Sequence, residues 1–256
     1  MKKIYFRFLL VFFTITIASC SSDSSPEIPV INKSLNKKSL GDSANDLLSD
    51  ANYTSLNLEI VFVSGFAPTQ RAIENLKTFL EERTYKPDGI NITYKEVASS
   101  ENAPFNSNEV IDIEDSEREF YNTGDDISVY IYFADGSNED DTENRFILGS
   151  AYRNTSMVIY KETINNYSNR INAPDISVIE TAVLTHEFGH LFGLVNIGSD
   201  PQSDHEDPDS EHHCTEENCL MRASLEFGGS IIDEIRGTPP VLGPLCIEDL
   251  RANGGK

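Results

Sequence analysis

The stretch THEFGHLFGLVN, residues 185–196, restricts the possible folds more than any other part of the sequence. It carries two histidines four residues apart, His186 and His190, near the end of a mostly apolar run that begins at Ile176. Side chains four residues apart lie on one face of an α-helix, so both imidazoles can approach a single metal ion. The sequence therefore predicts a long, largely buried helix over 176–195 with a metal-binding face.

A glutamate beside the first histidine adds a possible catalytic group. Glu187 lies off the line that joins the two histidines, where a carboxylate can act on a water molecule instead of binding the ion. A bound metal lowers the pKa of water toward about 7, and Glu187 could take its proton during attack on a peptide carbonyl. Such a pattern arises by chance in on the order of one chain in a hundred of this length. All five histidines, however, lie between residues 186 and 213, which generic packing does not explain.

Strand and helix patterns alternate before the histidine helix and predict an α/β (α+β) fold. We expect a mixed, twisted sheet with helices on its faces and an irregular C-terminal part. The catalytic domain would span 56–256, divided into an N-terminal subdomain (56–195) and a C-terminal subdomain (196–256). The strand patterns are LNLEIVFVSG (56–65), GINITYKEV (89–97), ISVYIYFA (127–134), RFILGSAY (145–152) and SMVIYKE (156–162), and the helix patterns are TQRAIENLKTFLEERT (69–84), about 109–121, and CIEDLRAN (246–253).

The N-terminus has the pattern of an export signal. A basic start is followed by an apolar run that is too short to span a bilayer, so 1–19 is predicted to be a signal peptide. The end of this segment, IASC, resembles the lipobox of bacterial lipoproteins, which implies that Cys20 carries a lipid. The alternative is an ordinary cleaved signal with an incidental cysteine. Residues 20–55 are mostly polar and without periodicity, so we expect a disordered tether to the membrane.

The charge of the chain limits its partners. The formal net charge is -22, and removal of 1–19, which contains three basic and no acidic residues, gives -22 - 3 = -25. Nucleic acid and anionic membrane surfaces repel such a chain, so we expect no nucleic-acid partner and membrane contact only through the lipid anchor. The expected location is the bacterial cell envelope, at the outer membrane, and the expected state is a monomer.

Two sequence blocks together resemble a known family. HEFGHLFG resembles the start of the metzincin signature, in which a third histidine follows three residues after the glycine, but Asn196 stands at that place here. HCTEENCLM, residues 213–221, is similar to the archaemetzincins. The resemblance implies a zinc metallopeptidase with an insert over 196–212, His213 as the third zinc ligand, and Met221 in the methionine turn below the metal. It also implies that RFILGSAY is the edge strand along which an extended peptide would pair.

Other residues could supply the third ligand. The rivals to His213 are Asn196 in place, His205, His212, or a glutamate such as Glu211. The cysteine directly after His213 favours His213, since it belongs to the archaemetzincin block.

The remaining cysteines have two possible roles. The archaemetzincins have a further cysteine pair that completes a structural zinc site, but this chain has only Cys246, with Gly243 in the place of the partner. One possibility is a disulfide with a free thiol. The other is a second zinc held by Cys214, Cys219, Cys246 and either His205 or His212. The acidic segment 196–212 could bind calcium, although a solvated loop is the simpler interpretation.

Three functions fit these features. The first is a lipid-anchored zinc metalloendopeptidase that cleaves peptides or proteins with Glu187 as general base. The second is a metal-binding or zinc-acquiring envelope lipoprotein without turnover, for which the clustered histidines and the acidic segment would suffice. The third is a metzincin-like fold kept for binding after loss of catalysis, to which Asn196 is the only pointer.

Overall fold

The computed structural model describes residues 31–143, 145–226 and 237–256. The predicted signal peptide (1–19) and Cys20 lie outside the described residues. Within the described part, no helix is both long enough and apolar enough to cross a bilayer.

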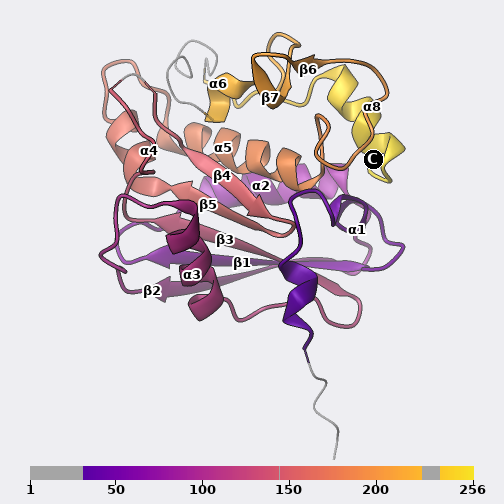
Figure 1. Cartoon of the computed structure of the whole chain (residues 1–256), viewed down its shortest axis with the longest axis horizontal. Coiled ribbons are helices and arrows are strands. Elements are labelled where there is room, and N and C mark those ends of the chain that lie inside the picture. Colours follow the sequence, from indigo (N-terminus) through magenta and orange to yellow (C-terminus); the bar gives the residue numbers. More distant parts are fainter. Residues whose placement is uncertain (1–30, 144, 227–236) are drawn as a thin grey trace, which may run out of the picture. The chain divides into compact units, whose positions relative to one another are not determined.

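The centre of the fold is a mixed five-stranded sheet with the order β2-β1-β3-β5-β4 (Figure 1). β1, β2, β3 and β5 are parallel, and β4 runs antiparallel to β5 at the edge. The prediction of a mixed α/β sheet is confirmed. The strands are β1 (Ser55–Val63), β2 (Gly89–Val97), β3 (Asp126–Ala134), β4 (Gly149–Arg153) and β5 (Ser156–Tyr160).

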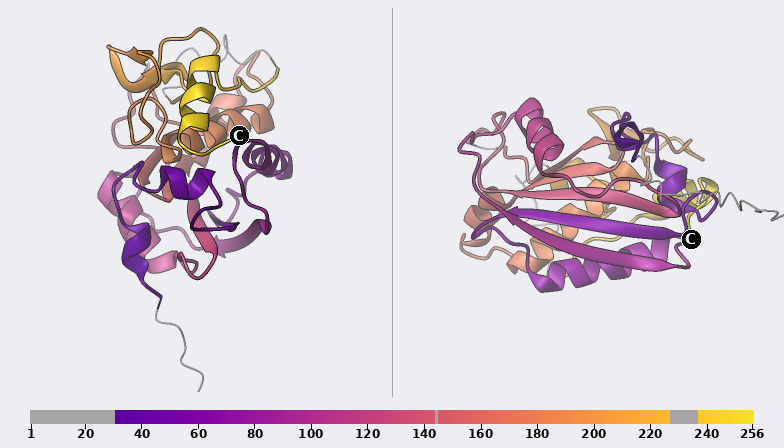
Figure 2. Two further views of the ribbon diagram at one scale, coloured as in Figure 1. Left: turned by 90° about the vertical axis from the view of Figure 1, so that its right-hand side faces the viewer. Right: turned by 90° about the horizontal axis from the view of Figure 1, so that it is seen from below.

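Helices cover both faces of this sheet. α2 (Gln70–Arg83) and α3 (Ser107–Glu117) lie on opposite faces, as Figure 2 shows. α5 (Ile176–Leu191) shares the face of α2 and packs between that helix and strands β4 and β5. A short helix, α4 (Lys161–Ser168), connects β5 to the α5 region and was not expected from the sequence. β3 is buried along almost its whole length, as its continuous apolar sequence requires.

The histidine helix α5 is enclosed along almost its whole length. All of its residues except Ile176 are buried, including polar side chains such as Glu180 and Thr181. Asp175 caps its start by accepting the backbone N–H of Ser177 at 2.9 Å. The helix ends at Leu191, four residues before the predicted end, because Gly193 adopts a positive φ of 71° that helical residues do not allow.

The predicted tether over 20–55 is wrong for the part that the structure describes. This part contains the short helices η1 (Lys33–Asn36) and α1 (Ala44–Leu48), and Leu47 and Leu48 are fully buried in the core. Periodicity analysis missed these elements because each spans little more than one turn.

Polar contacts hold this N-terminal segment to the sheet. Asn36 is buried and donates to Asn122 Oδ1 at 2.7 Å, and its own Oδ1 accepts the N–H of Asn122 at 2.9 Å. Asn154, in the β4–β5 turn, accepts the N–H of Lys38 and donates to the carbonyl of Leu35 at 2.8 Å. Hydrogen bonds therefore hold this segment in addition to the apolar burial of Leu47 and Leu48.

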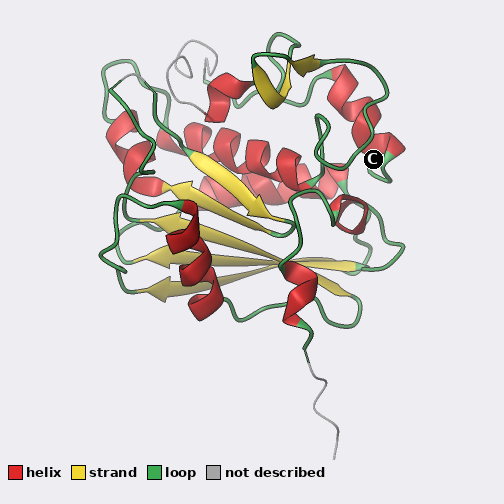
Figure 3. Cartoon of the chain, viewed as in Figure 1, coloured by secondary structure: helices red, strands yellow, loops and turns green. Residues whose placement is uncertain are grey.

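The described residues after α5 lie mainly in loops, as predicted (Figure 3). Within residues 192–226 and 237–256, its regular elements are the small hairpin of β6 (Glu206–Asp207) and β7 (Ser210–Cys214), the short helix α6 (Ala223–Glu226) and the helix α8 (Pro244–Ala252). α8 begins two residues before the predicted Cys246, with Pro244 in its first turn.

Candidate active site

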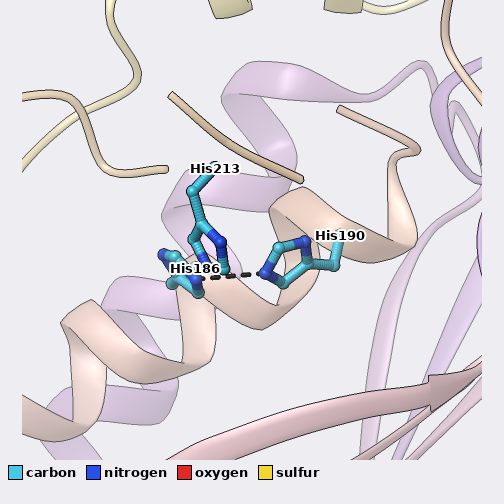
Figure 4. Close-up of side chains that lie close together, drawn as sticks. All are labelled: His186, His190 and His213. Atoms are coloured by element: carbon cyan, nitrogen blue, oxygen red, sulfur yellow. Dashed lines mark hydrogen bonds between the residues drawn. The ribbon is translucent and has the colours of Figure 1, made fainter. Parts of the chain in front are cut away.

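Three histidines converge at the boundary between α5 and the C-terminal loops (Figure 4). His186 and His190 come from α5 and His213 from β7, and one ring nitrogen of each lies within 4.8 Å of the others. The Nε2 atoms of His186 and His190 are 3.1 Å apart. Two nitrogen ligands of a tetrahedral zinc ion are separated by about 3.3 Å. The spacing of the two helical histidines therefore fits a shared zinc ion.

Hydrogen bonds orient two of these imidazoles. His186 Nδ1 donates to the carbonyl of Leu220 at 2.7 Å, and His213 Nδ1 donates to the carbonyl of Glu211 at 2.9 Å. Each bond holds the proton on Nδ1, so the Nε2 lone pair can bind a metal. Burial, together with the neighbouring His186 and His213, holds the pKa of His190 well below its usual value. This lowered pKa favours the neutral form of His190, which can bind a divalent cation together with His186 and His213.

Glu187 lies beside the histidines and contacts the edge strand of the sheet. Its Oε2 accepts the backbone N–H of Ala151 in β4 at 2.7 Å, and the side chain is buried. A cavity of about 240 Å³ opens next to it. The residues that line this cavity are Leu40, Ser150, Ala151, Glu187, His190, Ile197, Glu211, His212 and His213. Glu187 therefore faces the same space as two of the candidate ligands.

Met221 packs directly against the histidine helix. A Cβ at Gly189 would lie 2.1 Å from Met221 Sδ, so only glycine leaves room for the thioether between the turns that carry the histidines. Met221 is fully buried. Met221 thus packs against the turn of α5 between His186 and His190, and its role in a methionine turn stays a prediction.

The rivals for the third ligand lie elsewhere or make other contacts. Asn196 donates its amide to Glu206 at 3.1 Å, and His212 is half-exposed with Nδ1 3.4 Å from the carbonyl of Val195. His205 lies among the cysteines, 3.2 Å from Cys214 Sγ. Glu211 contributes its backbone carbonyl to His213. Of all the candidates, the structure brings only His213 together with the helical pair.

The three cysteines form a second buried group. Cys214, Cys219 and Cys246 lie close together. One ring nitrogen of His205 and the sulfur atoms of Cys214 and Cys246 lie within 4.8 Å of one another. The neighbouring thiols and backbone N–H groups lower the pKa of Cys219, which favours a thiolate there. Among the described residues, no group of acidic side chains alone is close enough to share an ion, so nothing here supports a calcium site in the acidic segment.

Sequence reasoning missed the groups that position these side chains. Ala151 and Leu220 act through their backbone atoms, which carry no residue-specific signal. Asp249, which accepts from His205 at 2.7 Å, is 44 positions away along the chain.

Comparison with known proteins identifies the fold. The sequence matches no protein-family profile and no curated protein. Among solved structures 26 chains match, including archaemetzincin from Methanopyrus kandleri, which is 20% identical over 78% of this chain and 96% of that chain, with a TM-score of 0.50. This chain has the archaemetzincin fold. A second match, metalloproteinase-II from Bacteroides fragilis, is 15% identical over 81% of this chain and 56% of that chain, with a TM-score of 0.41. The archaemetzincin-like fold places α5 and β4 side by side, which is the arrangement that brings Glu187 to the edge strand.

Proposed function

We propose that this protein is a zinc-dependent metallopeptidase that cleaves peptide bonds, with His186, His190 and His213 as the zinc ligands. The observation that carries the proposal is the convergence of three buried imidazoles beside the buried carboxylate of Glu187. When bound, zinc would supply Lewis acidity and lower the pKa of a coordinated water toward about 7. Three protein ligands leave a fourth position open, as hydrolytic zinc sites require.

Glu187 is the general base in this proposal. Its Oε2 is tied to the N–H of Ala151, which fixes the carboxylate against β4 while the side chain borders the cavity. Glu187 takes a proton from the attacking water and then delivers it to the nitrogen of the leaving amine. A carboxylate that is already positioned needs little reorganisation during this transfer.

The proposed substrate is an extended peptide or protein segment. β4 is the edge strand of the sheet and borders the cavity through Ser150 and Ala151. An edge strand offers unpaired backbone groups, so a peptide can add to it as a further strand and pass the zinc ligands.

Two further parts of the proposal concern location and a second metal. The IASC motif supports a lipid on Cys20 and a position at the bacterial cell envelope, with the folded part acting as a monomer. The cluster of Cys214, Cys219 and Cys246 supports a second, structural zinc ion in the C-terminal part.

Substitution of Glu187 by glutamine tests the enzymatic proposal. We expect Glu187→Gln to lower kcat on a peptide library by roughly 10²- to 10⁴-fold while the zinc content stays that of the wild type. His213→Ala should lose one zinc ion per chain. Glu217→Gln, which changes an exposed glutamate of the C-terminal part, serves as the matched control. Equal hydrolysis by the wild type and Glu187→Gln would refute the mechanism, and tight zinc binding without any hydrolysis by the wild type would favour the metal-binding lipoprotein.

A further inference from the structure

A buried cluster of sulfur and nitrogen atoms lies beside the candidate active site. Cys219 Sγ is 3.6 Å from Cys246 Sγ, and His205 Nδ1 is 3.2 Å from Cys214 Sγ. Sulfur and nitrogen ligands of one tetrahedral zinc ion are separated by about 3.6 to 3.8 Å. His205, Cys214 and Cys246 lie within 4.8 Å of one another, and Cys219 Sγ lies within that distance of Cys214 Sγ, so the four side chains form two overlapping groups.

Asp249 determines which nitrogen of His205 faces the thiols. Asp249 Oδ2 accepts the N–H of His205 Nε2 at 2.7 Å, and its Oδ1 accepts the backbone N–H of Gln202 at 2.7 Å. Both His205 and Asp249 are buried, and a buried carboxylate is costly unless such bonds compensate it. Because the proton is held on Nε2, the lone pair of Nδ1 is directed toward Cys214. A carboxylate on the far nitrogen is the usual support of a histidine that binds a metal.

Backbone amides point at two of the sulfur atoms. Cys219 Sγ accepts the N–H groups of Met221 at 3.4 Å and Gly243 at 3.2 Å, and Cys214 Sγ accepts the N–H of Glu216 at 3.4 Å. Such donors stabilise negative charge on sulfur. These donors therefore suit sulfur atoms that carry negative charge when they bind a metal ion.

We propose that His205 is the fourth ligand of a zinc site with Cys214, Cys219 and Cys246, and that Asp249 is its positioning residue. This inference rests on the second zinc ion of the proposed function, but it does not require peptidase activity. The ligand comes from the acidic segment 196–212, so this segment has a structural role. Through His205, this segment would be joined by the metal ion to α8, the helix that carries both Cys246 and Asp249.

This site also holds the ligands of the catalytic site in place. Cys214 directly follows His213, and its N–H donates to the carbonyl of Met221 at 2.7 Å. Cys219 directly precedes Leu220, whose carbonyl accepts the Nδ1 proton of His186. A filled Cys₃His site therefore orders the residue that follows His213 and the carbonyl of Leu220 that orients His186.

Glu216 is the competing fourth ligand. One carboxylate oxygen lies within 4.8 Å of the sulfur atoms of Cys214 and Cys219. However, Glu216 Oε2 accepts the N–H of Leu245 at the start of α8, and the side chain is only half-buried. Glu216 already has a structural role as a cap, and it has no partner comparable with Asp249 to orient it as a ligand.

Metal binding by variants of the full chain separates these alternatives. The wild type should bind two zinc ions, and its Co²⁺ form should show thiolate-to-cobalt charge-transfer bands. His205→Ala should lose tight binding of one ion in competition with a chelator. His205→Cys should retain two ions and gain charge-transfer intensity, since it adds a fourth thiolate to the same ion. Glu216→Gln and His212→Ala, the matched controls, should bind both ions as the wild type does.

The positioning role of Asp249 has its own signature. Asp249→Asn should weaken zinc binding at the cysteine site by about 10- to 100-fold while the charge-transfer bands keep their positions. A purely structural role would lower the unfolding temperature without changing the affinity of the folded protein. The inference is overturned if the wild type binds one zinc ion and has a Cys219–Cys246 disulfide, if Glu216→Gln loses the second ion, or if His205→Cys leaves the cobalt spectrum unchanged. None of these measurements uses peptide hydrolysis, so they stand apart from a failure of the proposed activity.

Discussion

The close approach of Gly189 to Met221 gives a test of the packing in α5. Whether Gly189→Ala raises or lowers the stability of the protein should depend on the side chain of Met221. Gly189 is in the interior of α5, where replacement of glycine by alanine normally stabilises a helix by roughly 0.5–1 kcal/mol. Here the added Cβ would lie 2.1 Å from Met221 Sδ and 2.9 Å from its Cε, whereas ordinary contacts begin at 3.4 Å. The thioether must therefore move by more than an ångström within a fully buried site. Overpacking of this kind costs about 1–3 kcal/mol.

The effect of Gly189→Ala on the free energy of unfolding should have opposite signs in the wild type and in Met221→Ala. In the wild type, Gly189→Ala should give no stabilisation and should cost up to about 2 kcal/mol, the overpacking cost minus the helix gain. In Met221→Ala, where the obstructing sulfur is gone, the same change should stabilise the protein by roughly 0.5–1 kcal/mol. The coupling energy of the double-mutant cycle should thus be about 1–3 kcal/mol.

Urea denaturation of the four proteins measures this cycle. All four should be saturated with zinc, because different metal occupancy would shift the free energy of unfolding by itself. Equal effects of Gly189→Ala in both backgrounds would refute the reasoning, since the methyl group and Met221 would then not compete for the same space.

Two further predictions concern the N-terminal segment, where Lys86 Nζ donates to the carbonyls of Asp46 at 2.8 Å and Tyr53 at 2.7 Å. Burial lowers the pKa of Lys86 from 10.5 to about 8, so the unfolded chain binds more protons than the folded one between these pH values. The stability of the wild type relative to Lys86→Met should therefore increase as the pH rises from 7.5 to 9.5 in urea denaturation, and a constant difference would contradict the assignment. Asn154→Ala removes the side-chain bonds to Leu35, Lys38 and Ser43. Hydrogen exchange should accelerate in residues 33–43 while α5 remains protected, and unchanged exchange there would show that other contacts hold the segment.

Periodicity predicts well those elements whose burial is continuous. β3 and α5 were recognised because uninterrupted apolar sequence leaves few alternatives, and the histidine spacing added the face of α5 that binds metal. The position at which a helix or strand ends is harder to predict, because it can depend on one small residue. The end of α5 at Leu191 depends on Gly193, whose effect on the backbone has no periodic signature.

The site was only partly predictable, because its supporting contacts join distant parts of the chain. His213 was favoured by the adjacent cysteine in a second sequence block, and the structure places it with His186 and His190. The choice between His205 and His212 beside the cysteines stayed open, since it depends on Asp249 in α8. No local pattern relates a histidine in a loop to an aspartate near the C-terminus.

The bond between Glu187 and the N–H of Ala151 has a consequence for alignment in the proposed reaction. The carboxylate is hydrogen-bonded to the strand that would receive the peptide, and α5 packs against that strand, so no contact through the C-terminal loops is needed to align the two. The metal position does depend on them, because one ligand comes from β7. Movement of the loops would therefore displace the electrophilic centre but leave the base in register with the peptide backbone. Changes in the C-terminal part should then alter turnover more than the choice of which bond along the strand is cleaved.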